Sequence, residues 1–341
     1  MDFPPRLSLA RRPTPFYLLE RLSAALGGPR IWIKRDDLTE AAAGGNKIRK
    51  LEFVLARARA AGCDALVTSG GIQSNHCRTT ALLGARLGFE VHLVLRDEGD
   101  FDPVPRGNLL LDYLAGAQVH LLPRREYLAH HAERVAELAA DLRRRGRTPW
   151  VIPVGASDGH GLWGYVDCAR ELAQDFAAAG IRPEVLVHAT GSGGTQAGLV
   201  AGAALFELPC RVVGVAVCDS AAWFERKIRA DLAEWAAEYG VGLEVGALPV
   251  EVDERFIGPG YARAGPEVYA TIRRLGALEG VVLDPVYTGK AFHGLLAMCE
   301  AGEFDGCRDL VFLHTGGLFG LCAEAARLGF RRPPRGEEGD G

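Results

Sequence analysis

Short apolar stretches alternate along the chain with segments in which apolar residues recur every three or four positions. Residues 30–37 (RIWIKRDD) alternate as a strand does, and residues 48–58 then carry one apolar helical face that ends near Gly62. Each of the later apolar stretches is followed by a segment with helical spacing or by a turn. These stretches are ALVTSG, EVHLVL, QVHLLP, WVIPVG, EVLVHATG, RVVGVAVC, VVLDP and DLVFLHTG. Strand, helix and strand in turn predict parallel sheets covered by helices on both faces.

The apolar stretches fall into two groups, so we predict an α/β protein with two open parallel-sheet domains. A chain of 341 residues exceeds the size at which a single core usually keeps growing. We expect residues 1–51 and 163–330 to form a large domain and residues 52–162 a small one. The last segment, 331–341, is rich in proline, glycine and charge, which favours a flexible tail.

Composition excludes several classes of partner. The net charge is −4 with both signs mixed, so neither nucleic acid nor a membrane surface is expected to bind. The eight cysteines are scattered singly, without zinc-site or disulfide-framework spacing, so no metal is expected. Without an export segment or an apolar run of about 18 residues, we expect a cytoplasmic protein.

A glycine-rich stretch, ATGSGGTQAG, follows the predicted strand EVLVH. A helix is expected to begin at about Gly194 or Thr195, where free N–H groups and the helix dipole favour a phosphate. A tight turn without any ligand would give the same pattern. A dinucleotide site is a further possibility, because Gly191, Gly193 and Ala197 have a related spacing and a possible ribose ligand, Asp219, ends the next strand.

Asp219 has a simpler interpretation as a helix cap, since it precedes the helical segment SAAWFERKI. A second glycine turn, GGNK, delivers Lys47 to the first turn of a helix. A single lysine is most often a solvated surface charge. Near a phosphate cradle, however, a lysine can form a Schiff base with pyridoxal phosphate, which supplies an electron sink for carbanion chemistry at an amino-acid Cα.

Five segments together resemble one family of enzymes. They are KRDDLTEAAAGGNKIRKLEF, SGGIQSNHCRTTA, GSGGTQAGL, LEGVVLDPVYTGKA and FLHTGG, in family order from about residue 5 to 325. The family is that of the D-cysteine desulfhydrases and 1-aminocyclopropane-1-carboxylate deaminases, which are tryptophan-synthase-β-like (fold type II) pyridoxal phosphate enzymes. The resemblance implies a small domain inserted into a larger one, pyridoxal phosphate in the cleft between them, and a homodimer.

The resemblance also implies roles for single residues. Lys47 matches the Schiff-base lysine, Asn75 the asparagine beside the cofactor's 3-hydroxyl oxygen, and Ser74 a serine near the substrate carboxylate that is a candidate proton carrier. Tyr261 and Tyr287 match two tyrosines on the substrate side, although ordinary core packing would also place tyrosines there. The phosphate loop corresponds to Gly191, Ser192, Gly193, Gly194 and Thr195.

Departures from the family pattern separate its two activities. The deaminases carry a glutamate that holds the pyridine nitrogen where this chain has Thr288, and a hydroxyl cannot keep that nitrogen protonated as a carboxylate does. His76 and Thr315, expected near the pocket, also match the desulfhydrases. Gly71 is a deaminase feature, and Trp163 is bulkier than expected in either group; we expect both to affect the volume available to the substrate.

The expected reaction is therefore an α,β-elimination on a small amino acid, most simply D-cysteine, which gives pyruvate, ammonia and hydrogen sulfide. Either Lys47 or the side of the cofactor that carries Ser74 and Tyr287 would take the Cα proton. Deamination of 1-aminocyclopropane-1-carboxylate and elimination from a related amino acid such as L-cysteate remain alternatives.

Overall fold

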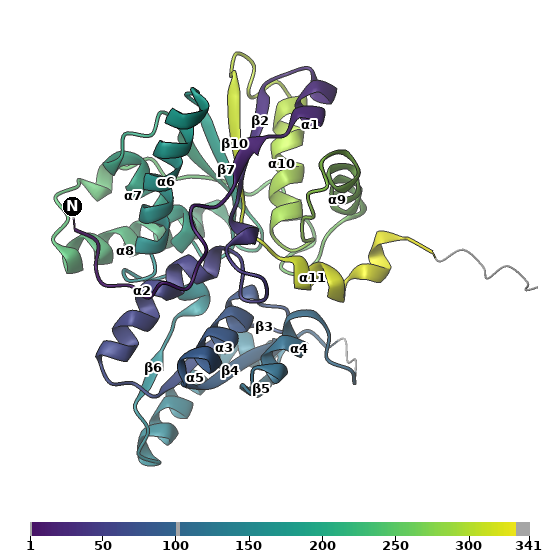
Figure 1. Ribbon diagram of the computed structural model, residues 1–341. Coiled ribbons are helices and arrows are strands. Elements are labelled where there is room, and N and C mark those ends of the chain that lie inside the picture. The colour runs from purple at the N-terminus through teal and green to yellow at the C-terminus, as the bar shows by residue number, and fades with distance from the viewer. Residues whose placement is uncertain (1, 100–102, 332–341) are drawn as a thin grey trace, which may run out of the picture.

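The computed structural model describes residues 2–99 and 103–331, and in these residues the chain forms two sheets covered by helices (Figure 1). The larger sheet has the order β1-β2-β10-β7-β8-β9 and the smaller one β5-β4-β3-β6. The strands are β1 (Phe16–Leu18), β2 (Arg30–Arg35), β3 (Ala65–Gly71), β4 (Glu90–Asp97), β5 (Gln118–Pro123), β6 (Pro149–Val151), β7 (Val185–Thr190), β8 (Arg211–Ala216), β9 (Glu251–Asp253) and β10 (Asp309–His314).

Helices lie on both faces of the larger sheet, with α6 and α7 on one side and α9 and α10 on the other (Figure 1). The helices are α1 (Glu20–Leu26), α2 (Asn46–Ala60), α3 (Asn75–Leu87), α4 (Gly107–Leu114), α5 (Arg124–Arg144), α6 (Trp163–Ala179), α7 (Gly194–Leu205), α8 (Ala221–Tyr239), α9 (Pro266–Glu279), α10 (Thr288–Glu300) and α11 (Leu318–Ala323). Among the described helices, none is both long enough and apolar enough to cross a membrane.

The predicted α/β fold with parallel sheets is confirmed, with two differences in the strands. β1 pairs antiparallel with β2, whereas the other pairs in both sheets are parallel. The predicted strand at residues 281–285 is wrong: this segment is extended but joins no sheet. Strand β10 already pairs with β2 on one side and with β7 on the other, so segment 281–285 cannot pair with it. The segment packs Val281 and Leu283 into the core instead.

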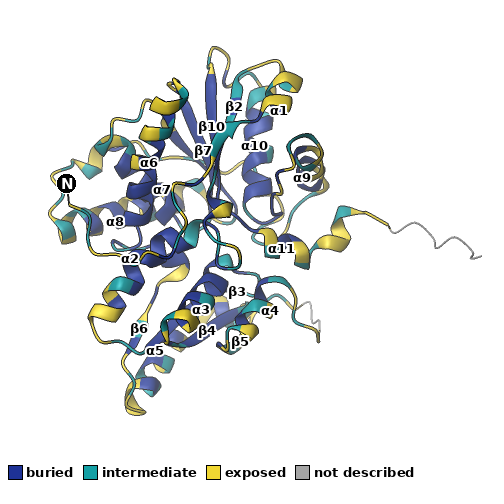
Figure 2. Ribbon diagram, viewed as in Figure 1, coloured by how far each residue is buried: buried dark blue, intermediate teal, exposed yellow. Residues whose placement is uncertain are grey.

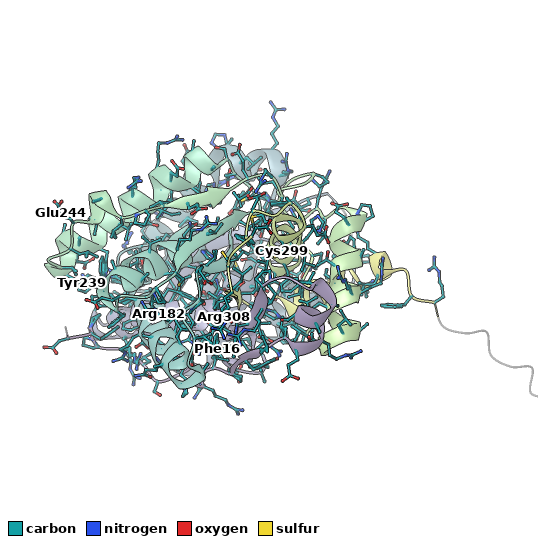
Figure 3. The ribbon with its side chains drawn as sticks, turned by 90° about the horizontal axis from the view of Figure 1, so that it is seen from above. Phe16, Arg182, Tyr239, Glu244, Cys299 and Arg308 are labelled. Atoms are coloured by element: carbon teal, nitrogen blue, oxygen red, sulfur yellow. The ribbon has the colours of Figure 1, made fainter. Side chains whose placement is uncertain are left out.

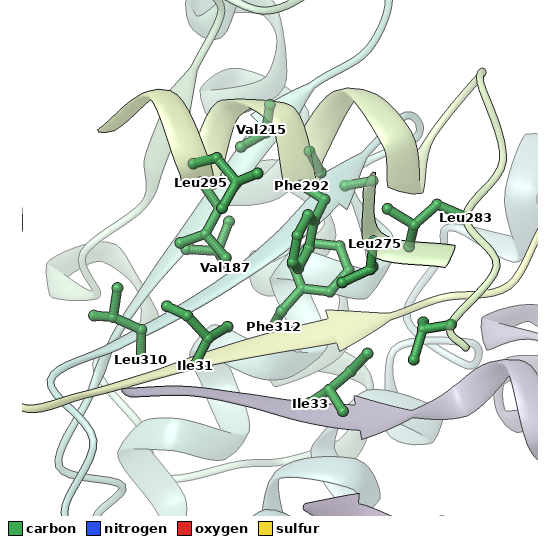
Figure 4. Packing of buried hydrophobic residues seen from close by; sticks show 14 of the residues in the cluster. Ile31, Ile33, Val187, Val215, Leu275, Leu283, Phe292, Leu295, Leu310 and Phe312 are labelled. Carbon is green, nitrogen blue, oxygen red and sulfur yellow. The ribbon is translucent and has the colours of Figure 1, made fainter. Parts of the chain in front are cut away.

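The central strands β7, β8 and β10 of the larger sheet are buried on both faces, which explains their nearly continuous apolar sequences (Figure 2). On one face, Val187 and Val215 of the sheet pack against Leu295 of α10 (Figure 4). Phe292 and Phe312 meet edge to face there, with ring centroids 4.8 Å apart. This face holds α10 rigidly against the sheet, and α10 begins at the cavity described below.

Helix α2 connects the two sheets. Its apolar face, from Ile48 onward, packs with strands of the smaller sheet. Its first turn is also tied to elements beside the larger sheet, because the buried Arg49 guanidinium donates to Asp36, just after β2, at 2.7 and 2.8 Å and to Glu171 of α6 at 3.0 Å. The domain boundary at residues 51 and 52 stays a prediction, and the predicted tail lies outside the described residues apart from residue 331.

The carboxyl ends of the strands of the larger sheet point toward the smaller sheet. Figure 3 is viewed from the opposite end, where Arg182 and Arg308 shortly precede β7 and β10. Ligands of open parallel sheets bind beyond the carboxyl ends of the strands. A cavity with a volume of about 510 Å³ lies there, lined by described residues of both sheets and their helices.

Candidate active site

The cavity brings together most of the residues that the sequence singled out. Its walls come from the ends of β3, β7 and β10, the first turns of α2, α3 and α7, and the loop before α9. The predicted residues that line it are Lys47, Gly71, Ser74, Asn75, His76, Gly191, Ser192, Gly193, Thr195, Tyr261, Tyr287 and Thr315. Gly194, Thr288 and Trp163 are not in its lining.

The GGNK turn has the geometry that places Lys47 at the cavity. Gly45 has φ +113°, and a Cβ there would lie 2.9 Å from the Thr315 carbonyl oxygen, so only glycine fits. The next residue, Asn46, donates its backbone N–H to the same carbonyl at 3.0 Å. The turn is thus fixed to the end of β10, and Lys47 enters the first turn of α2 facing the cavity.

Burial changes the acid–base behaviour of Lys47. It lowers the pKa of the Lys47 ammonium to about 8, against an opposing effect of the Cys77 thiol. At pH 7 roughly a tenth of such an amine is neutral, whereas an ordinary lysine is almost wholly charged. The neutral amine is the nucleophile in Schiff-base formation, so this environment prepares Lys47 for that role.

The glycine loop lies between β7 and α7 as predicted, and α7 begins at Gly194. Gly193 has φ +85°, a conformation that favours glycine. The Gly194 N–H donates to Ser157 Oγ at 3.2 Å, and the Ser157 hydroxyl in turn donates to Ser192 Oγ at 2.9 Å. The loop therefore presents backbone and hydroxyl groups around the amino end of a helix, which suits a phosphate.

Sequence analysis missed two residues behind this loop, Lys50 and Ser157. The buried Lys50 ammonium donates to Ser157 Oγ at 3.0 Å and to the Gly155 carbonyl at 2.7 Å. Gly155 has φ +71°, and a Cβ there would lie 3.2 Å from Lys47 Nζ. The segment GAS at residues 155–157, after a predicted strand, was the available signal, since small residues at a strand end permit close approach.

The first turn of α3 carries the segment SNH. Ser74 caps the helix by accepting the Cys77 N–H at 3.2 Å, which leaves its own hydroxyl proton free to donate toward the cavity. The buried His76 donates from Nε2 to Thr68 Oγ1 at 2.8 Å, because the Thr68 hydroxyl proton is used on the Ile152 carbonyl. Burial and the nearby lysines lower the pKa of His76 well below its usual value, so this imidazole is neutral.

Tyr261 and Tyr287 form a hydrogen-bonded pair, with their hydroxyl oxygens 2.7 Å apart. Burial raises the pKa of both phenols, so both keep their protons. One proton is used between the two oxygens and the other is available to a ligand. The Tyr261 ring lies between the Arg96 guanidinium, 4.7 Å from its centroid, and Gly71, where a Cβ would lie 2.9 Å from its Cε1 atom.

The loop that carries Tyr261 is held by a buried lysine. Lys290, in the first turn of α10, donates to the carbonyl oxygens of Ile257 and Gly260, each at 2.7 Å, and to that of Val217 at 3.3 Å. Three N–H groups thus meet three acceptors, which satisfies the ammonium completely. This bond set attaches the tyrosine loop to the end of β8.

Two sequence interpretations need correction, and a third stays a prediction. The Thr288 hydroxyl donates to the Asp284 carboxylate at 2.7 Å and Thr288 is not in the cavity lining, whereas Thr315 is, so the contact of Thr288 with the cofactor stays a prediction. Trp163, the first residue of α6, is packed in the core against Trp235 and other aromatic rings. It therefore cannot affect the substrate directly.

The residue that caps α8 is Ser220, not Asp219. Asp219 is exposed and belongs to the lining of the cavity.

Comparison with known proteins agrees with this geometry. Residues 7–316 match the family model described as "Pyridoxal-phosphate dependent enzyme", so the chain belongs to that family and pyridoxal phosphate is its cofactor. Lys47 and the glycine loop fit that cofactor, since they supply an amine of lowered pKa and a phosphate cradle in one cavity.

Within this family the chain groups with two named activities. It is 40% identical to the D-cysteine desulfhydrase of Klebsiella pneumoniae (strain 342), over 94% of this chain and 96% of the relative. It is 38% identical to the bifunctional D-cysteine desulfhydrase/1-aminocyclopropane-1-carboxylate deaminase, mitochondrial, of Arabidopsis thaliana, over 92% and 78%. A solved structure titled as an ACC deaminase homologue matches with a TM-score of 0.85, 36% identity and 95% coverage of both chains. The chain therefore belongs to the family that these proteins share.

Proposed function

We propose that this enzyme catalyses α,β-elimination on D-cysteine and releases pyruvate, ammonia and hydrogen sulfide. Support comes from the relatives named for that activity and from the cavity, which holds Lys47, Ser74 and the tyrosine pair within one enclosure. Pyridoxal phosphate, when bound, withdraws electrons from the substrate Cα. The protein residues bind the substrate, move its protons and exclude water.

In this proposal Lys47 and Ser74 handle the Cα proton. When Lys47 is not bound to the cofactor its amine would be free, and its lowered pKa would make it a base at neutral pH. The Ser74 hydroxyl, with its oxygen fixed by the Cys77 N–H, is placed to carry a proton or to bind the substrate carboxylate. Asn75, which lines the cavity, would donate to the cofactor's 3-hydroxyl oxygen.

The tyrosine pair handles the leaving group. The second phenol proton of the Tyr261–Tyr287 pair is not used between the two rings, so it can be donated to a departing thiolate. Its raised pKa does not prevent this, because the thiolate is stabilised by the hydrogen bond as charge develops on sulfur. A thiolate, which is a good leaving group, therefore needs little further stabilisation from the cavity residues.

The observation that carries the choice of substrate is the acid–base character of the inner cavity wall. Among the described residues that line the cavity, the only carboxylate is that of Asp219, which is exposed to solvent. The inner wall near β10 offers the Thr315 hydroxyl, and the Thr288 hydroxyl is used on Asp284. Without a carboxylate partner the pyridine nitrogen is a weaker electron sink, which thiolate elimination tolerates better than opening of a cyclopropane ring.

A second activity, deamination of 1-aminocyclopropane-1-carboxylate, is favoured by one feature. Gly71 is the residue that the deaminase motif carries, and it leaves the Tyr261 ring close to the backbone of β3. Residue 71 therefore agrees with the deaminase motif even though residue 288 does not.

The test compares the two products. Purified enzyme loaded with pyridoxal phosphate is incubated with D-cysteine, L-cysteine and 1-aminocyclopropane-1-carboxylate, and pyruvate, sulfide and 2-oxobutanoate are measured. The proposal predicts pyruvate and sulfide from D-cysteine at the highest kcat/KM, with the Lys47→Ala variant as the inactive control. Faster formation of 2-oxobutanoate from the cyclopropane substrate would assign the deaminase activity instead.

We further propose that the protein is a cytoplasmic homodimer. The eight cysteines are all free thiols, as expected in a reducing compartment, and the homodimer follows from the family resemblance. Light scattering coupled to size-exclusion chromatography measures the mass directly, and a mass near one chain, 36.6 kDa, would contradict the dimer.

A further inference from the structure

The side-chain amide of the half-buried Asn75 is hydrogen-bonded to that of Asn108, a buried asparagine on another helix. We infer that Asn108 is a positioning residue that fixes the orientation of the Asn75 amide, so that its NH₂ group faces the cavity. The inference deepens the proposed function, since it rests on the contact assigned there between Asn75 and the cofactor.

Asn108 lies at the second position of α4 and is fully buried. It is tied to the loop between β3 and α3 through Gln73. The Asn108 backbone N–H donates to Gln73 Oε1 at 2.9 Å, and the Asn108 side-chain Nδ2 donates to the Gln73 carbonyl at 2.8 Å. These bonds connect a helix more than thirty residues away to the segment that carries Asn75.

The orientation of the Asn108 amide is fixed by partners that have only one role. A backbone carbonyl, here that of Gln73, can only accept, so the nearby side-chain atom of Asn108 must be the nitrogen. A guanidinium can only donate, and Arg78 Nη1 lies 3.0 Å from the other atom, which must be the oxygen. The two assignments agree, so no ambiguity of oxygen and nitrogen remains at Asn108.

The orientation of Asn75 follows from the same logic. Its Oδ1 accepts from Asn108 Nδ2 at 3.1 Å and from Arg78 Nη1 at 3.3 Å. A flipped Asn75 amide would turn its NH₂ group toward two groups that can only donate, losing both bonds. The Asn75 Nδ2 atom must therefore point away from Asn108 and Arg78, and Asn75 lines the cavity.

The chemical consequence is that Asn75 presents an N–H donor, rather than its amide oxygen, to the cavity. An N–H donor beside the cofactor's 3-hydroxyl oxygen stabilises its ionised form, whereas an amide oxygen there would repel it. Arg78 shares the orienting role but also donates to Thr79 and to the Gly44 carbonyl of the GGNK turn. Among the described residues Asn108 makes no bond to Lys47 or to the turn; besides Asn75, its side chain bonds the Gln73 carbonyl and Arg78. Substitution of Asn108 therefore tests the Asn75 amide more directly than substitution of Arg78 would.

The test is a double-mutant cycle on the cofactor's visible absorption band in the loaded protein. The pH midpoint of that band is measured for the parent, Asn75→Ala, Asn108→Ala and the double variant, together with the dissociation constant of pyridoxal phosphate. We expect Asn108→Ala to shift the midpoint in the same direction as Asn75→Ala, and the double variant to shift no further than Asn75→Ala alone.

Two controls keep the test decisive. Asn108→Leu keeps a similar side-chain size without a donor and without a new charge, so it should shift the midpoint even if Asn108→Ala folds poorly. Leu110→Ala, on the exposed face of the same helix, should leave it at the parent value. A shift in Asn75→Ala without one in either Asn108 variant, or additive shifts, would overturn the inference. No shift in Asn75→Ala would overturn it by removing the assigned cofactor contact, while elimination activity in the parent remains a separate readout.

Discussion

Gly71→Ala is the smallest change that tests how the substrate side of the cavity is held. The added Cβ would lie 2.9 Å from Tyr261 Cε1 and 3.3 Å from the Tyr261 hydroxyl oxygen. Gly71 lies in β3 and its φ is outside the left-handed region, so the backbone accepts alanine and only the contact with Tyr261 changes.

The size of the effect follows from the contact. Carbon atoms pack at about 3.5–4.0 Å, so the Tyr261 ring must retreat by roughly 0.6–1.1 Å. The hydroxyl oxygens of Tyr261 and Tyr287, now 2.7 Å apart, would then exceed the range of a good hydrogen bond. Loss of that bond costs about 1 kcal/mol, and overpacking a core costs about 1–3 kcal/mol. A lower unfolded-state entropy offsets about 0.4–1 kcal/mol of the cost to stability.

We therefore expect kcat/KM for D-cysteine to fall about five- to tenfold, since each 1.4 kcal/mol is a factor of ten. Steady-state pyruvate formation measures it, with Gly28→Ala as the matched control because no atom lies within 4 Å of a Cβ there. In a Tyr261→Ala background the added methyl has room, so Gly71→Ala should cost almost nothing further. Parent-like kcat/KM in Gly71→Ala, or an equal loss in the Tyr261→Ala background, would refute the packing argument.

Three further predictions concern the lysine clamp, the phosphate loop and a buried acid. Lys290→Met removes the ammonium that holds loop 254–264, so hydrogen exchange in that loop should accelerate and KM should rise severalfold; unchanged exchange would contradict the clamp. Gly194→Ala puts a Cβ 2.6 Å from Ser157 Oγ, so pyridoxal phosphate affinity, measured by fluorescence titration, should fall at least tenfold. Burial raises the pKa of Asp112 to about 8, so its folded-state pKa exceeds the unfolded value and stability falls as pH rises from 4 to 8. Asp112→Asn should therefore gain unfolding free energy over the parent in urea at pH 8 and much less at pH 5; the reverse order would disprove this.

The sequence allowed prediction of those parts that depend on local pattern. Parallel strands at β3, β4, β7, β8 and β10, the helix beginning at Gly194 and the GGNK turn follow from apolar periodicity and from glycine's backbone freedom. Together with the order of the family motifs, these local features were enough to predict which segments form the cavity walls.

The rest depends on long-range packing, which a single sequence does not encode locally. The apolar segment 281–285 looks like a strand, but it pairs with no strand and instead packs Val281 and Leu283 into the core. Thr288 lies next to a tyrosine that faces the cavity, yet its hydroxyl turns to Asp284. Ser157 and Asn108 act through contacts with residues more than thirty positions away, and no motif marked them.

The most direct test of the account is the location of the cofactor on the chain. The protein contains five lysines, of which Lys50 also lies by the phosphate loop. Loaded enzyme is reduced with borohydride, digested, and mapped by peptide mass spectrometry. We predict the pyridoxyl group on Lys47 alone, and a label on Lys50 or any other lysine would contradict the assignment of Lys47 as the Schiff-base residue.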